Sequence, residues 1–329
     1  MTGERYMGKQ YDALCIGTAL MDISTSGLDF DTFLVNEPNL AEAITYGAGG
    51  DAVNEATALA KLGYRSALIT SVGVDFIGDF LRYLIAKNGV DVSGVHFVSR
   101  IPTAANNILI GKNDKRIYTL SKNATSFTEF CGADVDLERV REAKLVSFGS
   151  LFTHQKFQAE DYLQIFRAAK EAGAITCADT NVPWDDRSIN ELKPALAYLD
   201  YFFPSDMEGE KLTGMREPED MADVFLALGI GTVIITCGSR GSYIKSREYA
   251  FWQPAMLVDA VGTTGAGDCY AAGFMSGLID GLTPVQCARR AAATSACAVQ
   301  AVGATSGLKS IEQIETFAAQ YEDKNSSDD

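Results

Sequence analysis

Residues 262–268 have the sequence Gly-Thr-Thr-Gly-Ala-Gly-Asp, and the apolar stretch Cys-Tyr-Ala-Ala-Gly-Phe-Met follows at 269–275. Small side chains leave consecutive backbone N–H groups uncovered where a helix is expected to begin, and such a segment forms a concave site for an anion. A carboxylate at its rim, here Asp268, suits removal of a proton from a nucleophile that attacks the anion. The segment therefore indicates phosphoryl transfer to an alcohol, although a turn and a helix N-cap give the same short pattern.

A second glycine-rich segment near the N-terminus decides between these interpretations. Residues 49–56 have the sequence Gly-Gly-Asp-Ala-Val-Asn-Glu-Ala and continue into an Ala- and Leu-rich run that ends at Gly63. Gly49 and Gly50 allow the backbone to approach a ligand closely, and the apolar residues that follow share one helical face. Asp51 and Asn54 lie in the first turn of this predicted helix, where a carboxylate and an amide suit the binding of hydroxyl groups.

Together the two segments resemble the paired signatures of the PfkB (ribokinase-like) carbohydrate and nucleoside kinases. The first signature, GG-x-x-x-N-x-A-x-x-x-A-x-L-G, matches residues 49–63 at every fixed position. The second, D-T-T-G-A-G-D, matches residues 262–268 except at Gly262. The resemblance spans nearly the whole chain. It implies a sugar kinase that transfers the γ-phosphate of ATP, with Mg²⁺, to a hydroxyl of a sugar or sugar acid, most simply a hydroxymethyl group.

The resemblance also implies roles for individual residues. Asp268 would be the catalytic base, and Gly265, Ala266 and Gly267 would form the anion hole. The substrate-binding residues would be Asp22, Gly49, Gly50, Asp51, Asn54 and Asn106. Asp22 is expected at the carboxyl end of the first strand, where ligands bind in open α/β sheets. Asn106 is expected in the lid.

The ATP-binding residues implied by the resemblance are Ser205, Thr236, Gly238, Gly241 and Thr264. Glu208 would bind Mg²⁺ through water, in a segment that resembles the family's P-N-x-x-E. Two departures stand out, because Ser205 replaces the usual Asn and Gly262 replaces an Asp that shapes a K⁺ loop in some relatives. The sequence therefore does not decide whether K⁺ activates the protein. Asp179-Thr180-Asn181 resembles the family's D-x-N without its following Arg.

Composition limits the partners of the chain. The net charge of −15 argues against nucleic acid, since phosphate backbones need a basic surface. The apolar runs are too short to span a membrane, and no secretory signal pattern is present, which favours the cytoplasm. The odd number of cysteines, seven, predicts reduced core thiols. The expected partners are a small sugar and ATP, with a homodimer through the lid as a further expectation.

Alternation of short β-rich runs with helical periods predicts an α/β fold, specifically a three-layer α/β/α domain with a mostly parallel central sheet. The predicted strands are 13–18, 66–72, 145–149, 175–179, 201–204, 232–236 and 241–245. The predicted helices are 51–62, 76–88, 158–172, 218–228, 267–280, 284–301 and 310–320. The domain is expected at 10–320, with segments 23–46 and 101–120 inserted as a small β-sheet lid. Residues 1–9 and 321–329 are expected to be loose termini.

Alternatives to a sugar kinase remain at this stage. A nucleoside kinase would need an apolar platform near the lid, for which Phe30, Phe33 and Tyr46 are available. A sugar acid would need a cation such as Lys112, Lys115 or Arg116. A non-catalytic sugar or nucleotide sensor would be expected to lack Asp268. A Rossmann dehydrogenase is disfavoured because residues 17–21 lack the G-x-G-x-x-G pattern.

Overall fold

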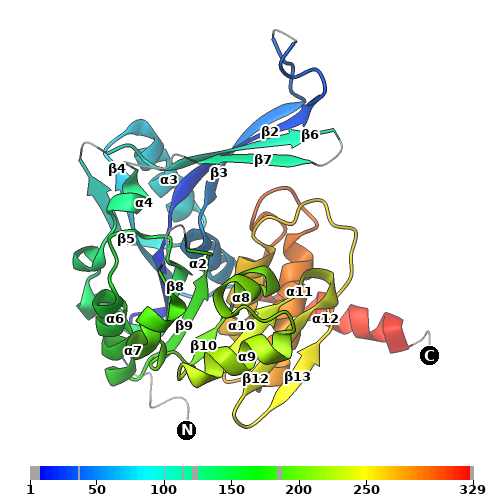
Figure 1. Cartoon of the computed structure of the whole chain (residues 1–329). Helices are drawn as coiled ribbons and strands as arrows, with labels where there is room; N and C mark the ends of the chain where they lie inside the picture. The colour runs from blue at the N-terminus through cyan, green and yellow to red at the C-terminus, as the bar shows by residue number, and fades with distance from the viewer. Residues whose placement is uncertain are drawn as a thin grey trace.

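The computed structural model describes residues 8–35, 38–99, 101–112, 115–120, 125–183 and 187–326. Within them a nine-stranded sheet has the order β13-β12-β11-β10-β9-β8-β1-β4-β5 (Figure 1). The strands are β1 Tyr11–Gly17, β4 Ser66–Gly73, β5 Asp91–Val98, β8 Ala143–Leu151, β9 Ile175–Thr180, β10 Tyr201–Phe202, β11 Thr232–Thr236, β12 Ser242–Ser246 and β13 Ala250–Gln253. All pairs from β5 to β11 are parallel, and β12 and β13 add an antiparallel edge.

Helices cover both faces of this sheet. They are α2 Asp51–Lys61, α3 Phe76–Lys87, α4 Ser126–Glu129, α5 Leu137–Arg141, α6 Ala159–Glu171, α7 Lys193–Leu196, α8 Asp206–Thr213, α9 Pro218–Ala227, α10 Ala266–Ile279, α11 Pro284–Ala298 and α12 Ile311–Ser326. Alternate residues of β1 pack into two separate cores, one with α2, α3, α10, α11 and α12 and the other with α5, α6, α7 and α9. A strand buried on both faces is typical of a parallel sheet between two helical layers.

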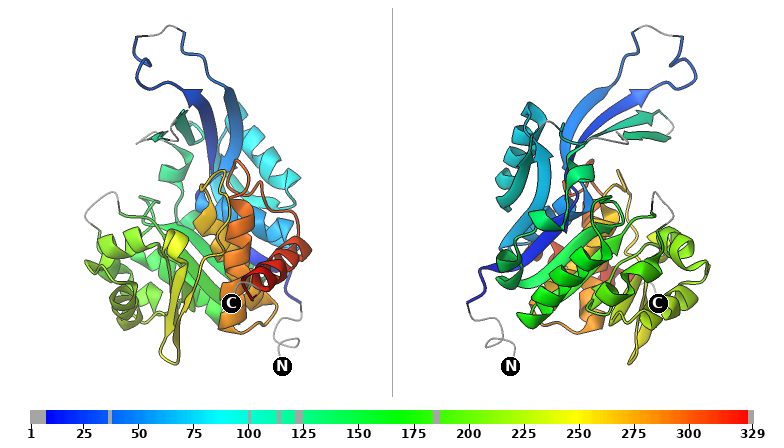
Figure 2. Two further views of the ribbon diagram at one scale, coloured as in Figure 1. Left: turned by 90° about the vertical axis from the view of Figure 1, so that its right-hand side faces the viewer. Right: turned by 60° about the vertical axis from the view of Figure 1, so that its left-hand side comes forward.

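A second sheet of four strands forms the lid. Its order is β3-β2-β6-β7, with bounds β2 Leu20–Leu28, β3 Ala43–Gly49, β6 Ala105–Gly111 and β7 Arg116–Leu120. β2 and β6 are parallel, whereas β2–β3 and β6–β7 are antiparallel. Both views of Figure 2 show the lid extending away from the rest of the molecule. The predicted three-layer fold with a small β lid is therefore confirmed.

The structure differs from the sequence-based expectations mainly at element ends. Every predicted strand and helix is present. Two edge strands, β5 and β13, and four helices, α4, α5, α7 and α8, were not predicted. The first lid segment was expected at 23–46, but its strands lie at 20–28 and 43–49. The described residues between these strands form turns and no strand. α12 continues to Ser326, beyond the expected end at residue 320. Lys9, expected in a loose terminus, donates a hydrogen bond to the Ala172 carbonyl (2.8 Å).

None of the described helices combines the length and the apolar character that a membrane crossing requires.

Candidate active site

The amino end of α2 forms the floor of the candidate site. Gly50 precedes the helix with φ 103°, a conformation that favours glycine, and a Cβ there would lie 2.3 Å from the Thr18 carbonyl oxygen. A Cβ on Gly49 would lie 2.2 Å from Asp22 Oδ2. The two glycines therefore allow Asp22 and the chain at Thr18 to pack directly against the helix entrance.

The sequence suggested that Asp22 lies at the end of β1, but the structure places it on the lid. β1 ends at Gly17, and Asp22 is the third residue of β2, opposite Asn106 of β6. Asn106 Nδ2 donates a hydrogen bond to Asp22 Oδ1 (3.1 Å). Burial raises the pKa of Asp22 to about 6, although the bond from Asn106 opposes this shift.

Asp268 lies in the first turn of α10. The helix is capped by Gly265 with φ 76°, where a Cβ would lie 2.5 Å from the Ala304 Cβ. Asn54 Nδ2 donates a hydrogen bond to Asp268 Oδ2 (2.6 Å), which joins the two glycine-rich segments. Burial, together with the charge of Asp51, raises the pKa of Asp268 well above its usual range. Such a carboxylate is a stronger proton acceptor than an exposed aspartate once it is ionised.

The anion hole differs in one respect from the expected set of amides. The Ala266 N–H donates to the Thr263 carbonyl (3.2 Å). Within the described residues, the N–H groups of Gly265 and Gly267 donate to no backbone carbonyl, which leaves these amides available to an anion at the helix N-terminus. A Cβ on Gly267 would meet nothing within 4 Å. Gly267 therefore borders open space and lies within the helix.

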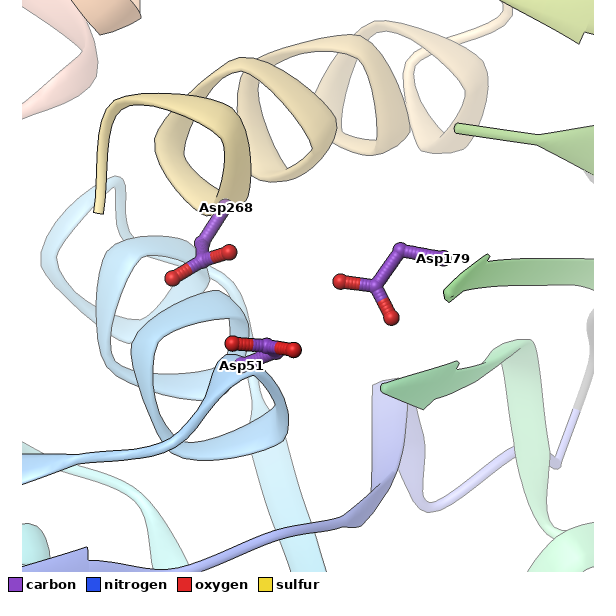
Figure 3. A group of neighbouring side chains, drawn as sticks. All are labelled: Asp51, Asp179 and Asp268. Atoms are coloured by element: carbon purple, nitrogen blue, oxygen red, sulfur yellow. The ribbon is translucent and has the colours of Figure 1, made fainter. Parts of the chain in front are cut away.

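Three aspartates from different elements converge beside this helix end (Figure 3). Carboxylate oxygens of Asp51, Asp179 and Asp268 all lie within 4.8 Å of one another. The backbone N–H of Ser150 donates to Asp179, and its hydroxyl donates to Asp51. Asn181 Nδ2 also donates to Asp51 Oδ2 (3.2 Å). Carboxylate oxygens are the donors that hard divalent cations prefer, so this group suits a metal ion chemically.

Two cavities meet at the amino end of α10. The first, here called the lid cavity, has a volume of about 390 Å³ and lies between the lid, α2 and α10. The second cavity has a volume of about 480 Å³ and is lined mainly by apolar side chains around α10, α11 and the segment 255–260. Thr263, Ala266 and Gly267 line both cavities. The two cavities therefore adjoin at the anion-hole segment.

Most of the predicted site residues line one of the two cavities. The lid cavity contains Asp22, Gly50, Asp51, Asn54, Asn106, Gly265, Ala266, Gly267 and Asp268. The second cavity contains Ser205, Thr236, Gly238 and Gly241. Thr264, predicted to bind ATP, lines the lid cavity and not the second one. Gly49 lies behind Asp22 and lines neither cavity.

Glu208 also lines neither cavity. Its Oε2 accepts hydrogen bonds from the backbone N–H (2.8 Å) and the hydroxyl (2.7 Å) of Ser205, which form a capping box at the start of α8. Burial raises the pKa of Glu208, and the charge of Asp51 adds to this effect. Ser205 therefore orients Glu208 despite replacing the expected Asn.

Sequence reasoning missed several residues of the lid cavity. Thr18, Ser150 and Thr153 line it, and so does Tyr118 of β7. Ser150 follows the predicted strand 145–149, at the same sheet edge as Asp179, and the general rule for ligand sites in α/β sheets would have indicated it. Arg116 Nη1 donates a hydrogen bond to Thr264 Oγ1 (3.1 Å), so the lid contacts the anion-hole segment directly.

Comparisons with known proteins agree with this geometry. The sequence matches the pfkB family carbohydrate kinase over residues 11–311. It is 31% identical to 2-dehydro-3-deoxygluconokinase of Bacillus subtilis, over 90% of this chain and 95% of that protein. The structure resembles Arabidopsis thaliana ribokinase complexed with ribose and ATP (TM-score 0.77, 25% identity, 94% of this chain and 98% of that chain). It also resembles a putative ribokinase II from E. coli in complex with ATP and Mg²⁺ (TM-score 0.78, 23% identity, 94% and 99%).

The chain belongs to the pfkB family of carbohydrate kinases, since the family match extends over nearly all of the sequence. Its class is that of an ATP-dependent sugar kinase.

Proposed function

We propose that the protein transfers the γ-phosphate of ATP to a hydroxymethyl group of a sugar bound in the lid cavity. The observation that carries this proposal is the meeting of the two cavities at Gly267, directly beside Asp268. A kinase must place a nucleotide and an alcohol on either side of the transferring phosphoryl group, roughly in line. A sensor without activity would not require a carboxylate at this junction.

The chain's own residues would perform the reaction in a simple order. Asp22 and Asn106 of the lid, with Asp51 of α2, would accept hydrogen bonds from the sugar hydroxyls. Asp268 would remove the proton from the attacking hydroxyl, while the Gly265 and Gly267 amides stabilise the charge on the transferring phosphoryl group. The apolar walls of the second cavity suit the nucleotide base. Closing the lid would exclude water and so limit hydrolysis of ATP.

Mg²⁺ would be held by Glu208 acting through water, because Asp268 must stay free to take the proton and Asp51 to bind a sugar hydroxyl. Glu208 offers hard oxygen atoms that Ser205 orients, and the nearby group of Asp51, Asp179 and Asp268 adds negative charge that would attract the ion. The ion would neutralise the phosphates of ATP and orient them. K⁺ is not included in the proposal, since Gly262 stands in place of the Asp of some relatives.

A nucleoside substrate is the weaker candidate. Phe30 and Phe33 form an edge-to-face pair (ring centroids 6.1 Å apart) in the turn after β2, but neither lines the lid cavity, and Tyr46 does not line it either. Tyr118 is the aromatic residue among those that line it. A sugar therefore fits the polar lining better than a nucleobase.

A homodimer through the lid is also proposed. The strand registers place Tyr46 opposite Ile23, and Leu109 opposite Ile117, on the face turned away from the cavity. Ile44 and Tyr46 on that face are 57% and 62% exposed. Exposed apolar surface of this kind is typical of an interaction site. Light scattering should give twice the chain mass, and Tyr46→Asp should give a monomer.

The seven cysteines are free, which supports a reducing compartment such as the cytoplasm.

Release of ADP, measured against a panel of sugars, sugar acids and nucleosides, tests the proposed activity. We expect at least one sugar to stimulate ADP release by the wild-type protein. The Asp268→Asn variant should show no ADP release above background with the same sugar. ADP release that no acceptor stimulates, or that is equal in the Asp268→Asn variant, would contradict the proposal.

A further inference from the structure

The turn at the end of β8, residues 150–153, holds two residues in an unfavourable backbone conformation. Within the described ranges of the chain, Ser150 (φ 63°) and Phe152 (φ 74°) are the two non-glycine residues with positive φ. The Thr153 N–H donates to the Ser150 carbonyl (3.1 Å), which closes the turn. Positive φ costs free energy for a residue with a Cβ, and such residues persist only where the surrounding structure fixes them. Other groups must therefore hold this segment, here called the β8 turn.

The β8 turn aligns two carboxylates of the candidate site. The Ser150 N–H donates to Asp179, and the Ser150 hydroxyl donates to Asp51. Ser150 and Asp51 both line the lid cavity. A Cβ on Gly149, which precedes the turn, would lie 2.6 Å from the backbone nitrogen of Ala52, so the turn packs directly against the start of α2. The direction of the Asp51 carboxylate therefore depends on the conformation of the turn.

Arg187 holds the side of the β8 turn that faces away from the cavity. Its Nη2 donates to the Phe152 carbonyl (3.0 Å), and its Nη1 donates to the Phe157 carbonyl (3.4 Å). Its guanidinium carbon Cζ also lies 5.9 Å from the centroid of the Phe152 ring. A guanidinium presents its donors in one rigid plane, so it can hold two carbonyl groups at a fixed separation. Arg187 therefore fixes both the backbone and the ring of one of the two residues with positive φ.

Asn181 supports the cavity side of the same turn. Its N–H donates to the Leu151 carbonyl (3.2 Å), and its Nδ2 donates to Ser150 Oγ (3.1 Å) and to Asp51 Oδ2 (3.2 Å). Asn181 thus contacts Ser150 and Asp51 directly, whereas Arg187 reaches them only through the backbone of the turn. The effect of Arg187 on Asp51 can therefore be separated from that of Asn181 by mutation.

We propose that Arg187 is a positioning residue for the sugar, because it holds the β8 turn and the turn aligns Asp51 through the Ser150 hydroxyl. This inference rests on the proposed kinase function, in which Asp51 accepts a hydrogen bond from a sugar hydroxyl. Without Arg187 the turn relaxes toward negative φ, and the Ser150 hydroxyl moves away from Asp51. The carboxylate then loses its fixed direction, which weakens sugar binding. Within the described chain neither Arg187 nor the β8 turn lines the second cavity, so ATP binding stays unaffected.

A double-mutant cycle between Arg187 and Ser150 tests the inference. Calorimetry measures the affinity for D-ribose, D-fructose and 2-dehydro-3-deoxygluconate, and the cycle uses the probe that the wild type binds most tightly. We expect Arg187→Met and Ser150→Ala each to weaken sugar binding about 10-fold, the order of one hydrogen bond. Since Arg187 acts through Ser150, the double variant should bind no more than ~2-fold more weakly than Arg187→Met alone. Losses that multiply to about 100-fold would show that the two residues act independently and would overturn the inference.

Further measurements separate positioning from a general effect on stability. All titrations are made at a temperature at which thermal melts show each variant to be folded. Arg187→Lys keeps the charge and can reach one carbonyl, so it should restore part of the lost affinity. Arg167→Met removes an exposed arginine of α6 and should leave sugar affinity unchanged. An equal loss of affinity for sugar and ATP, or an unchanged sugar affinity in Arg187→Met, would contradict the inference. If Arg187→Met does not fold, Arg187→Lys takes its place in the cycle under the same criterion.

Failure of the kinase function would give a different result. If none of the three probes binds or is phosphorylated, the proposed function fails for them, and hydrogen exchange decides whether Arg187 holds the β8 turn. The backbone amides of the turn should then exchange at least ~10-fold faster in Arg187→Met than in Arg167→Met, because the turn opens more often. Equal exchange rates in the two variants would refute the inference.

Discussion

Asp268 receives a hydrogen bond from Asn54 and lies within 4.8 Å of two other carboxylates, in surroundings that favour its protonated form. This environment is suited to a group that must take up a proton during each turnover. We predict that Asp268→Asn keeps the fold and ATP binding but lowers kcat at least ~100-fold, the lower range for loss of a general base. Steady-state kinetics with the best substrate measure this, and turnover within about threefold of wild type would refute the assignment.

Asp22 offers a test of sugar recognition at the same scale. Its carboxylate is bound on one side by Asn106 and faces the lid cavity. Asp22→Ala should weaken sugar binding by roughly 1–3 kcal/mol per lost charged hydrogen bond and leave ATP affinity nearly unchanged. Calorimetry with each ligand separates the two effects. An unchanged sugar affinity, or an equal loss for ATP, would remove Asp22 from the site.

At the scale of elements, the amino end of α10 lines both cavities. A side chain at Gly267 would enter open space, and the residue does not require positive φ, so a substitution there causes little backbone strain. Gly267→Val should therefore abolish turnover while sugar binding and the melting temperature stay close to wild type. Loss of stability with normal turnover per folded molecule would indicate that the segment is only a helix cap.

The contact between β7 and the anion-hole segment gives a prediction about the lid. Arg116→Met removes the hydrogen bond to Thr264 and a cation near the transferring phosphate. We expect kcat to fall about 10-fold, the order of one charged hydrogen bond, with a smaller change in KM for the sugar. Lys112→Met removes a lid cation that pairs with Asp29 and serves as the matched control. Equal effects of the two variants would argue against a specific role for Arg116.

The fold was largely predictable from the sequence because its elements carry strong local signals. The α2 and α10 signatures placed Asn54, Asp268 and the anion hole correctly relative to their helices. β5 was not predicted, since this edge strand is only partly buried and contains Gly94, which weakens a strand pattern. Asp22 was placed on the wrong strand because only Thr18 and Ala19 separate β1 from β2.

The lining of the lid cavity was much less predictable. Ser150 reaches Asp51 because its backbone has φ 63° at an irregularity in the pairing of β8 with β9. No local pattern signals such a conformation in a non-glycine residue. Tyr118 lines the cavity because of the register between β6 and β7, which opposes it to Ile108. Register depends on tertiary pairing, so the sequence alone did not determine which lid residues face the substrate.

At the scale of the whole molecule, a buried carboxyl group makes stability depend on pH. Glu55 of α2 is fully buried, and burial raises its pKa from 4.5 to about 8. Since its pKa is higher in the fold than in the unfolded chain, its contribution to stability is complete below pH 4.5 and is lost as the pH rises through about 8. The melting temperature of the wild type should therefore fall between pH 6 and pH 9.

Glu55→Gln should reduce this fall, because an amide does not ionise. Glu171→Gln, at an exposed residue of α6, should leave it unchanged. Thermal melts across the pH range provide the measurement. A fall that is as steep in Glu55→Gln as in the wild type would show that Glu55 does not carry the effect.

The central claim is that the two cavities are the two halves of one phosphoryl-transfer site. A structure of the protein with its best sugar and a non-hydrolysable ATP analogue tests this claim most directly. We predict the sugar in the lid cavity, one hydroxyl within about 2.6–3.2 Å of an Asp268 oxygen, and the γ-phosphate at the Gly265 and Gly267 amides. A nucleotide bound in the lid cavity, or a sugar with no hydroxyl near Asp268 in the closed complex, would contradict it.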